Sequence, residues 1–268
     1  MSQDYNIYSP DWIFSYSQLN SFHNCKYNFY LTYLKGFRGG QNAFSLWGSF
    51  LHEINEFYYK GIINKDDLIK YYQDNYEEKV NIDFPCSKFC DMNKLYYENG
   101  YDYVCFLRDV GIDDNVSDCE HAVSGELELS DGTKKKFKGI IDRVAFDDSG
   151  DLILSDYKSK KELKKKEQEE YFRQLYVYAY FYHEETGIYP KNLRFIFMRA
   201  KDNKKRYLTR EFKVEDMNKA IKWCTDTIEE ILSCNEWDKN ENDFFCQHLC
   251  GQLPFDCNIK EKLFLSNN

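Results

Sequence analysis

Two acidic residues and a lysine, in two neighbouring segments, have the types and spacing that phosphate chemistry needs. Asp142 lies in GIIDRVAF, and Asp156 and Lys158 lie in LILSDYKSK. Both segments are apolar and β-branched and enclose a DDSGD turn, which is typical of a β-hairpin. Side chains two apart on a strand share a face, so Asp156 and Lys158 point the same way, and Tyr157 points the other way. Antiparallel pairing would bring Asp142 alongside them.

This arrangement predicts a site for a divalent cation. Carboxylate oxygens are the ligands that Mg²⁺ prefers, and the bound ion keeps several waters. Lys158 beside the ion would hold the attacking water or stabilise the charge that grows on a phosphate. The alternative for a bare D-x-K triplet is a solvated surface hairpin. The apolar flanks of both strands argue against it, because burying two acids and an amine is costly without a purpose.

Charge is distributed unevenly around this hairpin. The whole chain carries a net charge of −9, yet residues 134–166 contain eleven Lys or Arg against six Asp or Glu. Such a basic segment would steer a phosphate backbone toward the acids, although a lysine-rich loop can also be merely solvated. The acidic remainder argues against non-specific binding of duplex nucleic acid by the whole surface.

Six segments in a fixed order carry a family resemblance, and they run from about Ser15 to Cys257. They are SYSQLNSFHNCKYNFYLTYL, WGSFLHEINEFYY, GIIDRV, SDYKSK, RQLYVYAYFY and CQHLCGQLPFDC. This order resembles the PD-(D/E)xK nuclease superfamily, specifically its RecB-like branch, which includes AddB nuclease domains and CRISPR-associated iron-sulfur exonucleases. The resemblance implies an α/β fold, with a restriction-endonuclease-like core in which helices flank a mixed central sheet.

The resemblance assigns the metal ligands. It implies that His52, Asp142, Asp156 and the backbone carbonyl of Tyr157 hold the ion, which we expect to be Mg²⁺ or Mn²⁺. An imidazole beside carboxylates tilts the preference toward manganese. The alternative for His52 is a satisfied core residue, because it lies in a largely apolar helical stripe.

The resemblance also implies catalytic roles for Lys158, Gln174 and Tyr178. Gln174 and Tyr178 are four apart in a helical segment, so they share a face and are expected to orient the lysine or to contact the scissile strand. An ordinary tyrosine-rich amphipathic helix is the alternative for this pair. Glu120 and Glu126 lie in an earlier strand and are further candidates for a carboxylate ligand, but their spacing places neither.

Grouped cysteines form the second clue. Cys246, Cys250 and Cys257 are spaced C-x3-C-x6-C near the end of the chain. The resemblance adds Cys25 and implies that the four thiolates bind a [4Fe-4S] cluster, which would join distant segments of the chain. Zinc would fit the same four thiolates.

A different cysteine grouping is also open, in which Cys86 and Cys90 join Cys246 and Cys250. The sequence shows no secretory leader and no apolar run of membrane length. We therefore expect a cytoplasmic protein, or one in the host cytoplasm if it is viral, because thiols stay reduced there and grouped cysteines bind metals rather than forming disulfides.

Length and composition favour one elaborated domain. The chain has 268 residues with 43% hydrophobic content, without a long linker or repeat, so we expect a single nuclease domain over 1–268. Within it we expect a helical N-terminal portion, a helical insertion at 61–117 and a cysteine-cluster tail at 240–268. The patterns predict helices near 15–34, 44–60, 66–79, 92–109, 168–186 and 215–233, and strands near 119–129, 137–146, 151–158, 192–199 and 206–213.

These observations predict a magnesium- or manganese-dependent DNA nuclease. The resemblance implies an exonuclease that acts on free or single-stranded DNA ends and works with a helicase, recombination or CRISPR integration partner. One alternative is a catalytically quiet nucleic-acid-binding or scaffold subunit of such a complex. Another is a zinc-stabilised interaction protein with an acidic surface. The sequence leaves the oligomeric state open.

Overall fold

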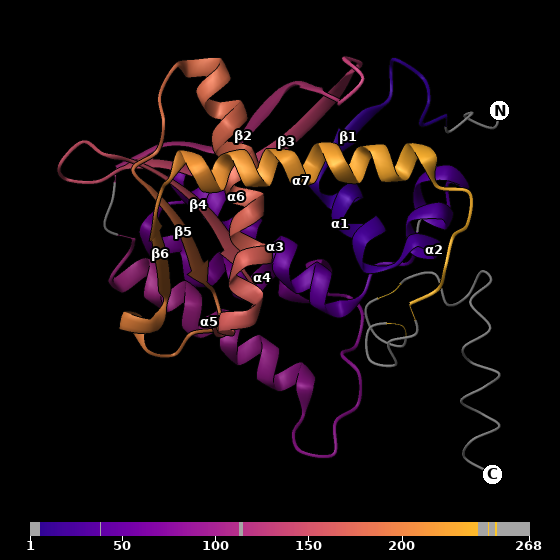
Figure 1. Cartoon of the computed structure of the whole chain (residues 1–268). Helices are drawn as coiled ribbons and strands as arrows, with labels where there is room; N and C mark the ends of the chain where they lie inside the picture. The colour runs from indigo at the N-terminus through magenta and orange to yellow at the C-terminus, as the bar shows by residue number, and fades with distance from the viewer. Residues whose placement is uncertain (1–5, 38, 113–114, 241–245, 247–249, 251–268) are drawn as a thin grey trace, which may run out of the picture. The chain divides into compact units, whose positions relative to one another are not determined.

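The computed structural model describes residues 6–37, 39–112, 115–240, 246 and 250 (Figure 1). Within these residues, seven α-helices flank a mixed sheet of six strands, which confirms the expected α/β class. The strands are β1 (Ile13–Ser15), β2 (Asn115–Glu128), β3 (Lys134–Phe146), β4 (Leu152–Lys158), β5 (Asn192–Phe197) and β6 (Tyr207–Glu211). The helices are α1 (Tyr16–Asn24), α2 (Lys26–Phe29), α3 (Ala43–Tyr59), α4 (Leu68–Lys79), α5 (Met92–Asp109), α6 (Lys165–Thr186) and α7 (Val214–Ser233).

The strands pair in the order β1-β3-β4-β5-β6, and β2 also pairs with β3. β3 and β4 are antiparallel, with Arg143 opposite Ser155, so the predicted hairpin is confirmed. Its turn is local in origin, because the Asp147 carboxylate accepts hydrogen bonds from the backbone N–H groups of Ser149 and Asp151. Gly150 completes it at φ 79°, a left-handed conformation that glycine adopts without steric cost.

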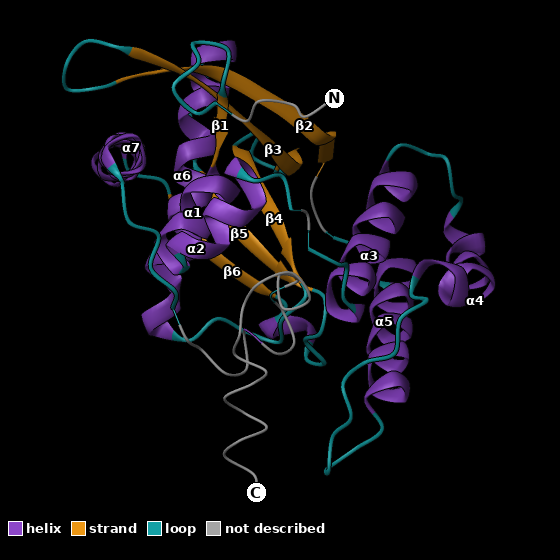
Figure 2. Cartoon of the chain, turned by 90° about the vertical axis from the view of Figure 1, so that its right-hand side faces the viewer, coloured by secondary structure: helices purple, strands orange, loops and turns teal. Residues whose placement is uncertain are grey.

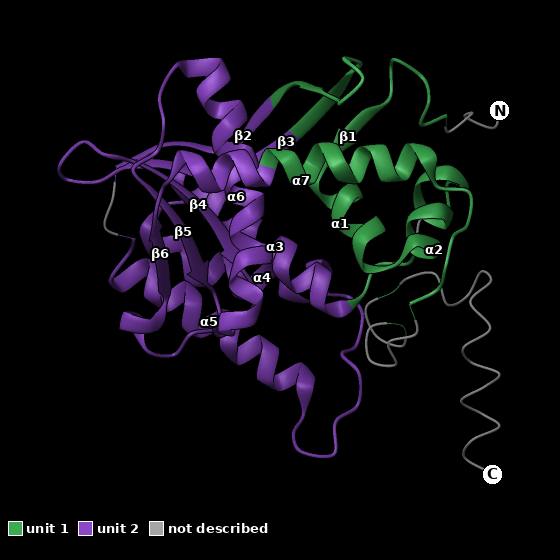
Figure 3. Cartoon of the chain, viewed as in Figure 1, with its two compact units in different colours: residues 1–42, 124–138, 221–268 green, residues 43–123, 139–220 purple. Residues whose placement is uncertain are grey.

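The chain divides into two compact units (Figure 3). One comprises residues 1–42, 124–138 and 221–268, and it includes β1, α1, α2 and the turn end of the β2–β3 hairpin. The other comprises residues 43–123 and 139–220, and it includes α3 to α6 and β4 to β6. The hairpin with the two acids and the lysine therefore belongs to the second unit.

Three helices of the second unit pack against one face of its strands. Figure 2 shows α3, α4 and α5 side by side, and their buried side chains form one cluster with Tyr157 of β4 and Ile196 of β5. Trp47 of α3 is fully buried there, and its indole N–H donates to the carbonyl of Tyr96 on α5 at 2.8 Å. This packing fixes the face of β4 on which Tyr157 lies.

The opposite face of the same strands is covered by α6. Phe172 of α6 meets Phe195 of β5 edge to face, with ring centres 4.8 Å apart. Asp156 and Lys158 alternate with Tyr157 along β4, so they point to this face. The two helices that bracket the hairpin, α3 and α6, thus approach it from opposite sides of the sheet.

The prediction of one continuous helix over 15–34 was wrong. The helix breaks at Cys25, whose backbone is extended at φ −160° and ψ 105°. The thiol of Cys25 accepts a hydrogen bond from the N–H of Asn28 at 3.4 Å and so caps α2, and the chain continues as a π-helix over Tyr30–Leu34. A side chain that captures a nearby N–H offers the backbone an alternative to continuing the helix.

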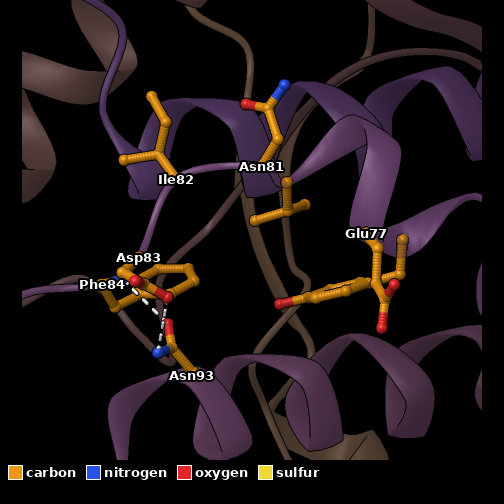
Figure 4. A pocket seen from close by; sticks show the side chains of 8 residues that line it. Glu77, Asn81, Ile82, Asp83, Phe84 and Asn93 are labelled. Carbon is orange, nitrogen blue, oxygen red and sulfur yellow. Dashed lines mark hydrogen bonds between the residues drawn. The ribbon is translucent and has the colours of Figure 1, made fainter.

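The segment between α4 and α5 is hydrogen-bonded to α5 (Figure 4). Asn93 accepts a hydrogen bond from the N–H of Phe84 at 2.9 Å and donates one to Asp83 at 3.0 Å. A hollow of about 400 Å³ lies beside this contact, lined by Tyr76, Glu77, Val80, Asn81, Ile82, Asp83, Phe84 and Asn93.

Among the described residues, every helix is too short or too polar to cross a membrane.

Candidate functional site

Three potential ligands from three different elements converge in the second unit. His52 of α3, Glu120 of β2 and Asp142 of β3 each present one ligand atom, and these atoms all lie within 4.8 Å of one another. Nδ1 of His52 is 3.5 Å from Oδ2 of Asp142 and 3.9 Å from Oε1 of Glu120. An imidazole with two carboxylates suits Mn²⁺ or Mg²⁺, with room left for water.

Glu120 reaches this group through an unusual backbone. It is the one non-glycine residue with a positive φ in the described part of the chain, at 57°. A left-handed conformation is unfavourable for a residue with a Cβ, and such strain often marks functional sites. Strand periodicity carries no signal of this turn, so the sequence did not place Glu120. The other candidate, Glu126, is exposed and belongs to the other unit.

The geometry of Asp142 links the two strands of the hairpin. Its Oδ2 accepts a hydrogen bond from the backbone N–H of Tyr157 at 2.8 Å. Burial and the nearby charge of Asp156 still raise the pKa of Asp142 from 3.8 to about 7. Burial disfavours the charged form of His52, but the charges of Asp142, Asp156 and Glu120 overcome it and raise the His52 pKa from 6.5 to about 9. Asp142 and His52 therefore bind protons more tightly than usual, and a cation would displace those protons.

Asp156 and Lys158 form a separate, tightly held pair. Nζ of Lys158 is 2.7 Å from Oδ2 of Asp156, and their side chains are only 18% and 8% exposed. Nζ also lies 5.3 Å from the centre of the Tyr171 ring and 5.4 Å from that of Phe195. A charge so enclosed by aromatic faces and a carboxylate has little freedom to move. Asp156 adds negative charge to the site without joining the three-residue group.

Helix α6 extends this arrangement through its two predicted residues. Lys158 donates a hydrogen bond to Oε1 of Gln174 at 3.4 Å, and Nε2 of Gln174 donates to the hydroxyl of Tyr178 at 3.1 Å. The structure therefore connects Tyr178, Gln174, Lys158 and Asp156 in one chain of contacts. The side chain of Tyr157 is buried and meets the His52 ring edge to face, at 5.5 Å between centres. Its side chain thus packs behind the site.

Gly139 is required where Tyr178 crosses β3. A Cβ at Gly139 would lie 2.4 Å from Cε1 of Tyr178, which is closer than real contacts allow. We expect Gly139→Ala to displace Tyr178 and Gln174 and to lower catalysis by about tenfold or more, because small misplacements of catalytic groups cost rate. Single-turnover rates and circular dichroism check this. Gly40→Ala is the control, since an added Cβ there meets no atom within 4 Å. An unchanged rate for Gly139→Ala would contradict the assignment.

The two raised pKa values predict how pH affects stability. In the folded state Asp142 has a pKa of about 7 instead of 3.8, and His52 about 9 instead of 6.5. Both groups bind protons more tightly when folded, so the metal-free protein loses their stabilisation as pH rises through these ranges. A cation replaces the protons, so Mg²⁺ should raise the melting temperature more at about pH 8.5 than at about pH 6. Thermal unfolding with and without Mg²⁺ measures this, and a shift that shrinks with rising pH would contradict it.

Three of the four predicted cluster cysteines lie in the first unit and share two asparagine neighbours. The thiol of Cys25 accepts the N–H of Asn28 and that of Asn240 at 3.4 and 3.5 Å. Cys246 donates to the carbonyl of Asn240 at 3.7 Å, and Cys250 donates to Oδ1 of Asn28 at 3.8 Å. Cys257, the fourth, lies outside the described residues. The three described thiols do not form a convergent group like that of His52.

The alternative cysteine pair lies elsewhere in the chain. Cys86 and Cys90 are exposed and belong to the second unit, between α4 and α5. Cys90 contacts the sulfur of Met92 at 3.7 Å. The structure gives the pair no contact that singles it out as a metal site.

Comparisons with known proteins identify the family of this chain and structures that are similar to it. The model of a family described as the PD-(D/E)XK nuclease superfamily matches residues 13–254. A crystal structure described as a "Putative exonuclease" from Eubacterium rectale is similar with a TM-score of 0.50 and 15% identity, covering 92% of this chain and 97% of that chain. The structure of a protein designated SSO0001 is similar with a TM-score of 0.35 and 16% identity, covering 72% and 84%. No curated protein sequence matches the chain.

Proposed function

Because the chain belongs to the PD-(D/E)XK nuclease superfamily, we propose that it is a Mg²⁺- or Mn²⁺-dependent nuclease that hydrolyses phosphodiester bonds in DNA. The observation that carries this proposal is the convergence of His52, Glu120 and Asp142 beside the Asp156–Lys158 pair. The family match runs through both compact units. We therefore also propose that the two units are parts of one nuclease domain.

The residues present fit a hard divalent cation. His52, Glu120 and Asp142 would hold it, Asp156 would add a third carboxylate, and the carbonyl of Tyr157 is a further candidate. Burial and the charge of Asp156 raise the pKa of Asp142, and the neighbouring carboxylates raise that of His52, so acidic groups that a cation would neutralise are concentrated here. A bound ion would lower the pKa of a coordinated water and screen the phosphate.

Lys158 would position the nucleophile or stabilise the charged phosphorane oxygens. Its ammonium group already has two contacts, Asp156 and Gln174, which fix its direction. The remaining N–H can donate to the attacking water or to a phosphate oxygen. Gln174 and Tyr178 would hold the lysine on the α6 side and contact the scissile strand. The ring of Tyr171 and that of Phe195 would keep bulk water away from the amine.

We propose DNA with free or single-stranded ends as the substrate and exonucleolytic cleavage as the mode. The similar Eubacterium rectale structure is described as a putative exonuclease. A basic segment follows the catalytic strand directly and continues into α6, where phosphates would be attracted toward the acids. Its lysines are Lys160, Lys161, Lys164, Lys165 and Lys166. A helicase, recombination or CRISPR integration complex would supply such ends.

The decisive experiment is digestion of end-labelled single- and double-stranded DNA with Mn²⁺, Mg²⁺ or chelator. Stepwise release of short products from an end supports the exonuclease. Products cut at internal positions would show that cleavage is endonucleolytic instead. The absence of digestion with any cation would instead favour the catalytically quiet scaffold subunit, against which the Asp, Asp, Lys and Gln set now argues. An RNA substrate series tests the preference for DNA.

We propose that Cys25, Cys246, Cys250 and Cys257 hold a [4Fe-4S] cluster in a reducing compartment such as the cytoplasm. Two backbone N–H groups point at the thiol of Cys25, and such hydrogen bonds stabilise a thiolate ligand. The segment after α7 is already fastened to α2, since the carbonyl of Asp238 accepts the N–H of Tyr27 at 3.0 Å. The cluster would reinforce this connection between distant parts of the chain.

Anaerobic purification separates the two candidate occupants of the cysteine site. A brown protein with visible iron-sulfur absorption and about four iron per chain supports the cluster. A colourless protein with one bound zinc per chain would show instead that zinc occupies the cysteine site. Cys25→Ser should remove the colour, whereas Cys105→Ser should keep it, because Cys105 lies on α5 in the other unit.

A further inference from the structure

Glu120 adopts its strained conformation between two anchored neighbours. Cys119 is only 4% exposed and is therefore fixed in the core. His121 is fixed by its ring, which meets the ring of Tyr182 on α6 edge to face at 5.4 Å between centres. With both neighbours held, the chain turns at Glu120 itself, where φ is 57°.

The anchor on the His121 side consists of two carboxylates. Nδ1 of His121 is 2.7 Å from Oδ2 of Asp118, and Nε2 is 3.3 Å from Oε2 of Glu185 on α6. The other oxygen of Asp118 accepts the N–H of Cys119 at 2.8 Å. Both ring nitrogens are therefore engaged, and His121 presents no free nitrogen to a metal ion.

The consequence of this anchoring appears at the metal site. His121 contacts α6 through Tyr182 and Glu185, whereas the Glu120 carboxylate lies toward α3, with Oε1 3.9 Å from Nδ1 of His52. The left-handed φ of 57° at Glu120 sets the direction in which its side chain leaves the backbone. A strained residue keeps such a conformation only when its surroundings determine it.

We infer that His121, clamped between Asp118 and Glu185, is a positioning residue that holds Glu120 in the left-handed conformation and thereby completes the metal site. The inference rests on the proposed metal-dependent function. It assigns to α6 a second task beyond carrying Gln174, because Glu185 at its far end fixes β2. Mutation of a group that orients a metal ligand typically lowers metal affinity by about 10- to 100-fold, and we expect a loss of this order for His121.

The test is a double-mutant cycle on Mn²⁺ affinity, measured without DNA by electron paramagnetic resonance. His121→Phe keeps the ring against Tyr182 but removes both polar contacts, and it should weaken Mn²⁺ binding about tenfold. Glu120→Gln should weaken it at least as much. If His121 acts through Glu120, the double variant should bind no more weakly than Glu120→Gln alone.

The control is His183, a histidine on α6. His183 stacks on Tyr189 with ring centres 3.7 Å apart, so His183→Phe also replaces a histidine ring that contacts a tyrosine. It should leave the Mn²⁺ affinity unchanged. Melting temperatures of the metal-free variants show whether any change is merely a loss of stability.

The outcomes separate this inference from the proposed function. The positioning role of His121 would be overturned if His121→Phe left the Mn²⁺ affinity unchanged. It would also be overturned if His121→Phe weakened Mn²⁺ binding equally in the wild-type protein and in Glu120→Gln. Either result would leave the nuclease proposal intact. A wild-type protein that binds no Mn²⁺ would overturn the metal-dependent function itself. If His121→Phe does not fold, Glu185→Ala gives the same test, because Glu185 is about half exposed. It should weaken binding in the same direction, and unchanged affinity would overturn the clamp.

Discussion

Asp156→Asn is expected to lower the rate of DNA cleavage at least about a thousandfold while the protein remains folded. Removing one electrostatic group from a reacting centre typically lowers the rate by about a hundred- to a thousandfold, and this substitution also removes a proposed metal ligand. The amide has the same shape as the carboxyl, so the packing of β4 is preserved. It lacks the charge that attracts a cation and balances Lys158, which lies 2.7 Å away. Cleavage rates with saturating Mn²⁺, together with circular dichroism, measure the two effects.

A matched substitution isolates the effect of position. Asp148 lies in the turn of the same hairpin and is exposed, so Asp148→Asn removes the same charge from the same hairpin outside the site. It should retain the wild-type rate. Metal-dependent cleavage near the wild-type rate in Asp156→Asn would show that Asp156 is not a ligand or a catalytic group, and the role assigned to the hairpin would fail with it.

Lys158→Met is expected to lower the cleavage rate about a hundred- to a thousandfold through kcat, with Mn²⁺ binding retained. Methionine fills much of the same space between Tyr171 and Phe195 but supplies no proton donor. The transition state then loses the ammonium group, whereas the ligands are untouched. Single-turnover kinetics and Mn²⁺ titration separate these contributions.

The comparison with Asp156→Asn is what makes this prediction specific. Asp156→Asn should weaken both metal binding and catalysis, and Lys158→Met should weaken catalysis alone. Lys158→Arg should not restore the rate, because the planar guanidinium is larger and directs its donors differently from an ammonium group. Equal loss of Mn²⁺ affinity in both lysine variants would indicate that Lys158 shapes the site instead of acting in the reaction.

The division of the site between two helices explains why single motifs were weak predictors. α3 delivers His52 from the face on which Tyr157 is buried, and α6 delivers Gln174 from the face on which Lys158 lies. Each helix is ordinary when its sequence is considered alone, because a histidine in an apolar stripe or a tyrosine-rich helix has a structural explanation. The hairpin between them is what gives both helices a common target.

Some features were determined by the sequence because their causes are local. The β3–β4 hairpin follows from β-branched strands and from Asp147 and Gly150, whose turn interactions involve only their neighbours. The shared face of Asp156 and Lys158 follows from the two-residue period of a strand. Gln174 and Tyr178 lie four apart on a helix, and their hydrogen bond is equally local.

Other features depended on contacts between distant segments, and only the tertiary structure decided them. Glu120 joins the site because β2 turns left-handed between a buried Cys119 and a His121 held by α6. The first predicted helix breaks at Cys25, whose thiol accepts not only the nearby N–H of Asn28 but also the N–H of Asn240, 215 residues further along the chain. Strand and helix periods describe regular backbone, and they cannot register a conformation that exists only because remote side chains stabilise it.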